Sequence, residues 1–367
     1  MKKIGIGTAY VVAVTLSLFL FFRQDQHDTV SREDSPVQHI SPIPPTKKPE
    51  PTPTPAVPQK LLPGGKHVYQ TFNNCGPAAL SMALSLNGVY VSQEELGLSL
   101  RPYQHPQGNN DDKSVTLSEL AREAEKRGFV SYYRPAGSID LLVSFISHDI
   151  PMVTRTLLKK DDDIGHYRVV KGYDTNSREL IQDDSLQGKN LTYSYDEFMQ
   201  VWEPYNYEFL VIVPPEKQDI AIQLLGKLAD EQAAWEQAYV YALEQIERSN
   251  SSAYPFLNMS VALYHLGRYG ESIEMYESVA DTLSDRTLWY QIEPILSYYA
   301  VGDDDRVMTM TEEILSHDNR AFSELYYVRG LVLKGQEKDH EASEAFQLAD
   351  MYNKSGSWHV NVEKIIF

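Results

Sequence analysis

The chain has 367 residues, of which 42% are hydrophobic and 23% charged, so it is long enough for about two domains and is not disordered throughout. Its 33 basic and 51 acidic residues give a formal charge of −18, and no basic patch stands out, so we expect no nucleic-acid partner. The one cysteine, Cys75, excludes a disulfide framework and a thiolate zinc site, and leaves a choice between buried filler and a reactive thiol.

Residues 1–23 have the pattern of a membrane anchor. Two lysines precede an uncharged stretch at 4–22, and Arg23 follows it. A helix of this length, at about 1.5 Å per residue, spans roughly the 30 Å of bilayer hydrocarbon. Because the stretch ends in large apolar residues, we expect an uncleaved signal anchor, with the globular domains outside the cytoplasm at the cell membrane. A cleaved signal peptide would lead to the same compartment.

Residues 24–62 are polar and rich in proline, with an alternating Pro-Thr run at 51–55. Such a run favours extended polyproline II and does not build a core. We therefore expect a disordered linker that holds the next domain away from the membrane.

A globular domain is predicted over residues 63–215. Its helical stretches come first and its strand-like runs later, a pattern typical of an α+β domain. The expected helices are 75–86, 118–127 and 138–147, and the expected strands are 152–158, 167–173, 180–182 and 209–213.

Residues 216–367 carry only helix–turn–helix patterns. The glycines at 267, 302 and 335 recur with a spacing near 34, and small residues such as Ser272 and Ala342 stand where paired helices would cross. This period and these positions resemble tetratricopeptide repeats. The segment has 12 basic and 26 acidic residues, so −14 of the charge of −18 lies here. We expect the repeats to offer a binding surface to a protein partner.

Cys75 begins the first expected helix of the globular domain. Gly76 and Pro77 follow it, and proline suits the first turn of a helix, where its missing N–H costs nothing. Unpaired N–H groups and the helix dipole favour an anion at this end, so we expect a lowered pKa for the Cys75 thiol. A nucleophilic thiol also needs a base, which in turn needs an orienting group.

The best candidate for the base is His166, in the run Gly-His-Tyr-Arg-Val-Val at 165–170. Together with residues 180–184 this run predicts a β-hairpin that turns near Thr175. Such a turn would set His166 directly opposite Asp184 on one face and point Asp183 to the other. A shift of the turn would change the pairing, so Asp183 stays open as the orienting carboxylate.

Taken together, these motifs resemble a known family. From Gln70 the chain reads Gln-x-x-Asn-x-Cys-Gly-Pro-Ala, followed later by Gly-His-Tyr, by Gly-Tyr-Asp, and by Asp184 with a glycine four positions on. This pattern is similar to the bacteriocin-processing, double-glycine-leader cysteine peptidases, and most closely to their stand-alone peptidase-like domains in bacterial envelope proteins. The resemblance covers about residues 62–214.

The resemblance implies a papain-like fold with Cys75 as nucleophile, His166 as base and then acid, and Asp184 as the orienting carboxylate. It also implies that Gln70 donates to the oxyanion. Two departures keep alternatives open. Serine follows Asp184 where the family usually has proline, and Gln70 precedes the cysteine by five residues rather than six, so Asn73 or Asn74 is an alternative donor.

The sequence thus predicts a membrane-anchored cysteine peptidase that hydrolyses peptide bonds without a cofactor, by acyl transfer through a thioester. Acyl transfer to an amine would use the same residues. The competing hypothesis is a catalytically silent papain-like domain in a scaffold protein whose acidic repeats do the binding. No G-x-x-x-x-G-K-[ST] motif occurs, so the chain carries no such site for ATP.

Overall fold

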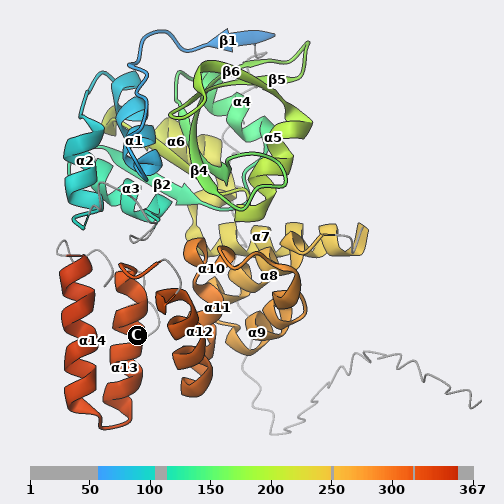
Figure 1. Cartoon of the computed structure of the whole chain (residues 1–367). Coiled ribbons are helices and arrows are strands. Elements are labelled where there is room, and N and C mark those ends of the chain that lie inside the picture. The colour runs from blue at the N-terminus through green and yellow to red at the C-terminus, as the bar shows by residue number, and fades with distance from the viewer. Residues whose placement is uncertain (1–56, 104–113, 249–251, 317–318, 354–367) are drawn as a thin grey trace, which may run out of the picture. The chain divides into compact units, whose positions relative to one another are not determined.

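The computed structural model describes residues 57–103, 114–248, 252–316 and 319–353 (Figure 1). The expected membrane anchor, residues 1–23, and most of the expected linker lie outside these ranges. Among the residues that are described, no helix is both long and apolar enough to cross a bilayer.

The α+β part consists of seven strands and the helices that cover them, within the described residues. The strands are β1 (Gln59–Leu61), β2 (Val130–Arg134), β3 (Met152–Leu157), β4 (Gly165–Asp174), β5 (Glu179–Asp184), β6 (Gly188–Ser194) and β7 (Phe209–Val213). The helices are α1 (Cys75–Leu86), α2 (Gln93–Leu100), α3 (Leu117–Glu125), α4 (Ile139–Ser147), α5 (Tyr195–Trp202) and α6 (Gln218–Leu225).

These strands form one antiparallel sheet in the order β2-β7-β3-β4-β5-β6, and β1 pairs with the far end of β4. The pairing of β1 differs from our expectation, because Gln59–Leu61 belong to the segment that we took for a disordered linker. The backbone of this short strand lies opposite Gly172, whose missing side chain permits the approach: a Cβ there would be 2.8 Å from the carbonyl oxygen of Lys60.

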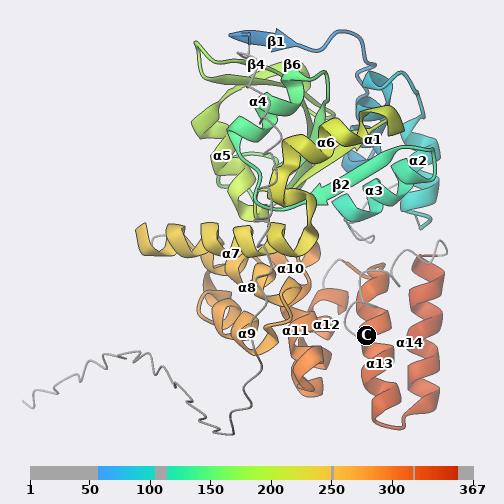
Figure 2. The same cartoon turned by 180° about the vertical axis from the view of Figure 1, so that it is seen from behind.

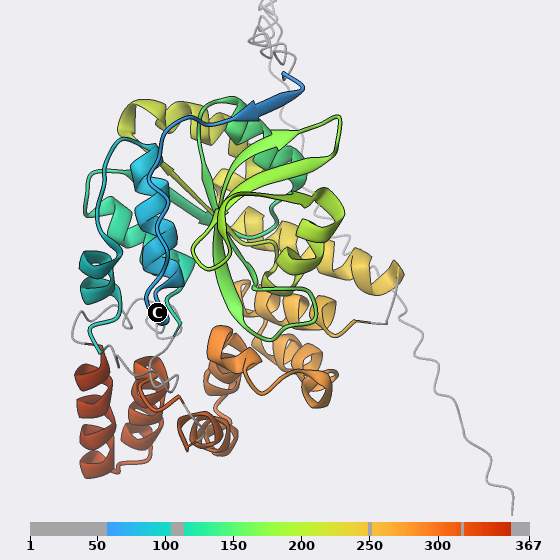
Figure 3. The ribbon, with the colours of Figure 1, turned by 45° about the horizontal axis from the view of Figure 1, so that its top comes forward.

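Alternating residues of the strands divide the core between the two faces of the sheet. Figures 1 and 2 show α1, α2 and α3 on one face and α4 and α5 on the other, and Figure 3 shows α1 lying beside β4. The first face buries Leu80, Leu84, Leu120, Val153, Val169, Leu210 and Ile212. The second buries Phe145, Met152, Phe198, Trp202, Phe209 and Val211.

Besides β1, four of these elements were not expected from the sequence: α2, α5, β2 and β6. Each of the two helices is eight residues long and follows a serine N-cap, Ser92 for α2 and Ser194 for α5. The side chain of each serine accepts the backbone N–H three residues on. At Ser194, Glu197 completes a capping box, a signal that could have predicted this helix. Strand β6 consists mostly of exposed and half-buried residues and has little apolar character.

The helical part contains α7 (Glu231–Arg248), α8 (Tyr254–His265), α9 (Tyr269–Glu277), α10 (Thr287–Tyr290), α11 (Glu293–Val301), α12 (Asp304–Ser316), α13 (Ser323–Gly335) and α14 (Asp339–Tyr352). Three consecutive pairs pack together, α8 with α9, α11 with α12 and α13 with α14, as expected for tetratricopeptide-like repeats. Helix α6, which lies in the segment that we assigned to the repeats from residue 216, instead packs on α4 and β7.

Small residues stand where the repeat helices cross. The hydroxyl of Ser272 lies 3.1 Å from that of Ser260 on α8 and 2.8 Å from that of Ser297 on α11. At Gly330 a Cβ would come within 3 Å of the ring of Phe346 on the partner helix. The close approach of these helices therefore depends on the small residues.

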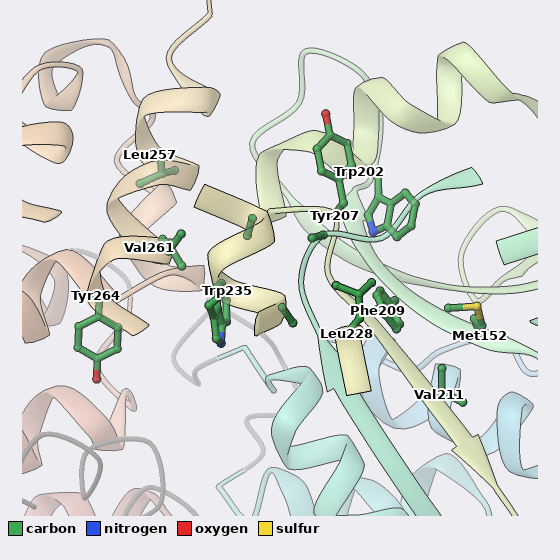
Figure 4. Close-up of a cluster of buried hydrophobic side chains, with 14 of the residues drawn as sticks. Met152, Trp202, Tyr207, Phe209, Val211, Leu228, Trp235, Leu257, Val261 and Tyr264 are labelled. Carbon is green, nitrogen blue, oxygen red and sulfur yellow. The ribbon is translucent and has the colours of Figure 1, made fainter. Parts of the chain in front are cut away.

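The two parts share one hydrophobic cluster. Trp235, Val261 and Tyr264 of the helical part belong to the same cluster of buried side chains as Trp202 and Phe209 of the sheet part (Figure 4). Two hydrogen bonds between Asn206 and Asn258, one of 3.2 Å and one of 3.1 Å, join the same surfaces. The helical part is thus packed against the α+β part rather than tethered to it.

Candidate active site

Three of the four predicted site residues line a single cavity of about 500 Å³. Cys75 is the first residue of α1 and is half-buried, His166 is the second residue of β4 and is buried, and Gln70 lies in the loop before α1. Asp184, the last residue of β5, is fully buried behind His166. The fold therefore brings together residues that are more than 90 positions apart in the sequence.

Burial governs the charge of the thiol. It raises the pKa of Cys75 to about 11, and the guanidinium of Arg101 and the backbone N–H groups of Cys75 and Gly76 offset this only in part. The prediction of a lowered pKa was therefore wrong: the start of α1 does act in the expected direction, but loss of hydration acts more strongly. A thiol with this pKa is almost entirely protonated at neutral pH.

The hairpin that carries the base and the carboxylate turns later than expected. Asp184 lies directly opposite Arg168 rather than His166, because the loop spans 175–178 and the pairing shifts between Val170 and Gly172. His166 is two residues from Arg168 and so faces the same side of the sheet as Asp184. Their side chains meet diagonally, with 3.0 Å between His166 Nε2 and Asp184 Oδ1.

Asp184 is held as an anion by the groups around it. Besides His166, the backbone N–H groups of Leu186 and Gln187 donate to its Oδ1 at 2.7 and 2.8 Å, and Arg168 Nε lies 3.4 Å from its Oδ2. Against the effect of burial, these donors and charges lower the pKa of Asp184 to about 2. Burial also lowers the pKa of His166, with Asp184 opposing, so the ring is neutral at neutral pH.

With Nε2 of His166 hydrogen-bonded to the carboxylate, Nδ1 is the ring nitrogen left to act toward the cavity that Cys75 lines. A neutral ring that donates from Nε2 carries its lone pair on Nδ1. The arrangement can therefore accept a proton on the side of the cavity.

Asp183, the alternative carboxylate, points to the other face of the sheet. Its Oδ2 lies 2.7 Å from Nζ of Lys171, and its Oδ1 accepts the backbone N–H of Asn190 at 2.9 Å. Both side chains of this ion pair are almost fully buried. Asp183 thus has a structural partner and does not contact His166.

The candidate oxyanion donors differ in where they lie and in the contacts they make. The hydroxyl of Ser185 donates to Gln70 Oε1 at 2.7 Å, which leaves the amide nitrogen of Gln70 as the donor end. Asn74 is buried, with its Oδ1 bound by Arg101 at 2.6 Å and its amide donating to Thr71. Asn73 lines the cavity like Gln70 and remains an alternative donor.

Sequence reasoning missed several residues at this site. Arg101 holds Asn74 and partly offsets the rise in the thiol pKa that burial causes. Ser185, noted only as a departure from the family pattern, orients Gln70. Trp289 and Tyr290 of α10 also line the cavity, although they come from the helical part. No local signal marks α10 as part of a site, because its contribution arises only from the packing of the two parts.

The fold and the placement of these side chains define a papain-like α+β domain followed by a helical region. Residues 54–209 match the model of a family described as "Peptidase_C39 like family", which confirms the resemblance to the double-glycine-leader cysteine peptidases over this part of the chain. No protein of curated function matches the sequence.

Solved structures of similar domains include the peptidase domain of Streptococcus ComA, a bifunctional ABC transporter involved in quorum sensing, with 22% identity over 40% of this chain and 96% of that one and a TM-score of 0.31. A protein from Bacillus anthracis described as a C39-like peptidase has 17% identity over 41% and 94%, with a TM-score of 0.32. A double-glycine motif protease of an AMS/PCAT transporter, solved with the leader peptide, has 14% identity over 42% and 94%, with a TM-score of 0.31.

Proposed function

We propose that the chain is a cysteine peptidase that hydrolyses peptide bonds with Cys75 as nucleophile, His166 as general base and acid, and Asp184 as the group that orients His166. The observation that carries this proposal is the shared cavity: the one sulfur nucleophile of the chain and a neutral, carboxylate-bound imidazole line the same space. The match to peptidase-like domains over residues 54–209 supports the same class of reaction.

In the proposed reaction, Nδ1 of His166 accepts the proton of the Cys75 thiol as the sulfur attacks the substrate carbonyl carbon. The imidazolium then donates that proton to the leaving amine, and a thioester remains on Cys75. Water, deprotonated by the same ring, attacks the thioester, and the thiol is regenerated. Because the pKa of His166 is lowered, the ring stays neutral and able to act as a base below its ordinary pKa of about 6.5.

Charge on the carbonyl oxygen would be stabilised by the amide nitrogen of Gln70 and the backbone N–H of Cys75. Ser185 fixes the amide of Gln70 by occupying its oxygen, so the nitrogen is directed as a donor before substrate arrives. A donor that is already oriented costs little reorganisation during the reaction.

The proposal extends to the setting of the enzyme. The apolar stretch at residues 4–22 supports a single-pass anchor in the cell membrane with the globular parts outside the cytoplasm. We further propose that a protein partner binds the acidic helical repeats. The substrate would be a peptide or protein segment. The cavity that Cys75 lines has a volume of about 500 Å³ and is bordered by side chains from both parts, which suits such a substrate.

One observation favours a second function, a silent peptidase-like domain in a binding protein. Burial raises the pKa of Cys75 to about 11, so almost no thiolate is present in the unliganded site at neutral pH. In the first function the base must remove this proton during the attack, whereas in the second it is never removed.

Peptide hydrolysis by the full chain separates the two functions. With a pool of internally quenched peptides, the wild type is expected to cleave a subset and Cys75→Ala to cleave none, because the variant lacks the attacking sulfur. Leu98→Ala serves as the control and should keep full activity. Leu98 is an exposed side chain on α2 and does not line the cavity that contains Cys75. Cleavage that survives in Cys75→Ala would refute the peptidase assignment.

A further inference from the structure

The mouth of the catalytic cavity exposes apolar side chains. Phe72, Ile164 and Leu186 line it and are 46%, 37% and 48% exposed. They come from the loop before α1, from the residue before β4 and from the turn after β5, each within a few residues of Cys75, His166 or Asp184. Large apolar side chains gathered at one opening mark a surface that binds something apolar.

The helical part completes this apolar opening. Trp289 and Tyr290 of α10 line the same cavity, and a Cβ added to Gly165, the residue before His166, would lie 2.9 Å from the ring of Tyr290. Trp289 is half-buried, so part of its indole remains free to contact another molecule. One wall of the cavity beside the reactive groups is therefore aromatic.

This wall is held in place by polar contacts on both sides of α10. Before it, Arg286 pairs with Asp163 at 2.8 Å, and the hydroxyl of Ser284 donates to the same carboxylate at 2.9 Å. After it, the amide of Gln291 donates to the carbonyl of Pro204 at 3.1 Å. The guanidinium of Arg155 donates to the carbonyl oxygen of Tyr290 itself. Trp289 is thus presented on a segment anchored to the α+β part.

We propose that Trp289 determines substrate specificity by forming, with Phe72, Ile164 and Leu186, a subsite for a large apolar or aromatic side chain next to the scissile bond. The proposal rests on the proposed function in one respect, that Cys75 and His166 mark where the peptide lies. It assigns to the helical part a direct contact with substrate. In a hydrophobic pocket, one methylene more or less changes discrimination by about 10- to 200-fold, so a side chain that fills the pocket should be preferred at least about tenfold.

The test uses protection of Cys75, the only thiol in the chain, from alkylation by iodoacetamide at pH 9, followed by intact-mass spectrometry of the full chain. The competitors are capped tripeptides acetyl-Gly-Xaa-Gly-amide with Phe, Leu, Ala or Asp at Xaa. We expect Phe and Leu to protect at concentrations at least about tenfold lower than Ala and Asp. In Trp289→Ala this preference should fall to about threefold or less.

Two further variants test whether any effect of Trp289→Ala comes from damage to the fold. Trp289→Phe keeps an aromatic face and should keep the preference for Phe over Ala. Tyr299→Ala removes an aromatic ring that is likewise half-buried at the edge of the shared cluster but lines none of the described cavities, and it should behave as the wild type. A wild type that shows no preference, or a preference that persists in Trp289→Ala, would overturn the proposal.

Protection needs binding but no turnover, so the two proposals fail separately. A chain that hydrolyses no peptide yet prefers Phe at Xaa would refute the peptidase assignment and support the subsite. A chain that hydrolyses peptides but shows no preference for Phe at Xaa would support the peptidase assignment and refute the subsite.

Discussion

Replacing His166 by glutamine is expected to lower kcat/KM for peptide hydrolysis by about 1,000-fold. Glutamine keeps a polar side chain of similar size but cannot take the thiol proton, and general acid–base catalysis of this kind contributes roughly 10²- to 10⁴-fold. The need for a base is acute here, because burial raises the pKa of Cys75 to about 11 and leaves almost no thiolate at neutral pH. The loss should fall on kcat more than on KM.

His67→Gln is the matched control. His67 lies beside β5, with its Nε2 2.9 Å from the backbone oxygen of Asp184, but it does not line the cavity that Cys75 and His166 line. Its replacement should leave kcat/KM within about threefold of the wild type. Equal losses in the two variants would show that His166 acts only through the fold, and the base assignment would fail.

Replacing Asp183 by alanine is expected to destabilise the fold by about 3–5 kcal/mol without removing a group from the site. The change leaves the ammonium of Lys171 buried and unpaired, since its only ion pair among the described residues is the 2.7 Å contact to Asp183. An uncompensated charge in the interior costs this much, although the pair itself adds little net stability. The free energy of unfolding from urea titration measures the effect.

The double variant Asp183→Leu with Lys171→Met distinguishes this cause from general damage to β5. It removes both charges together and replaces them with apolar side chains, so it should recover most of the lost stability. If the double variant is as unstable as Asp183→Ala, the unpaired lysine is not the reason. If Asp183→Ala changes the free energy of unfolding by less than about 1 kcal/mol, the claim that an unpaired Lys171 destabilises the fold is wrong.

Local chemistry made part of the fold predictable. Helix α1 runs from Cys75 to Leu86 as expected, because Pro77 suits a first turn and Asn87-Gly88 ends the helix. Strand β7 is a continuous apolar run in the interior of the sheet, and such runs are easily recognised in a sequence. The half-polar strands β2 and β6 and the short helices α2 and α5 have weaker sequence patterns and were missed.

The sequence predicted which residues the fold brings together, but it predicted their geometry less well. The motifs pointed to Cys75, His166, Asp184 and Gln70, but the pairing of the hairpin depends on the loop at 175–178 and on the shift between Val170 and Gly172. No sequence pattern locates such a shift with certainty. His166 and Asp184 still meet because residues two apart on a strand share a face.

The sequence did not predict how burial changes the pKa of Cys75 or which distant side chains pack at the site. The position of Cys75 at a helix start suggested a lowered pKa, yet the raised value follows from the side chains packed around it. The aromatic wall from α10 depends on contacts between residues more than 100 positions apart, such as Asp163 with Arg286. Such contacts leave no local trace.

The most direct test of the central claim is acylation of Cys75. Mixing the full chain with p-nitrophenyl acetate at neutral pH should transfer one acetyl group to the sulfur, with release of p-nitrophenolate, and intact-mass and peptide mapping would locate it. The account predicts a thioester on Cys75 that forms in the wild type, is absent from Cys75→Ala and forms far more slowly in His166→Gln. Acetylation that is undiminished without the sulfur, or that proceeds equally well without the imidazole, would contradict it.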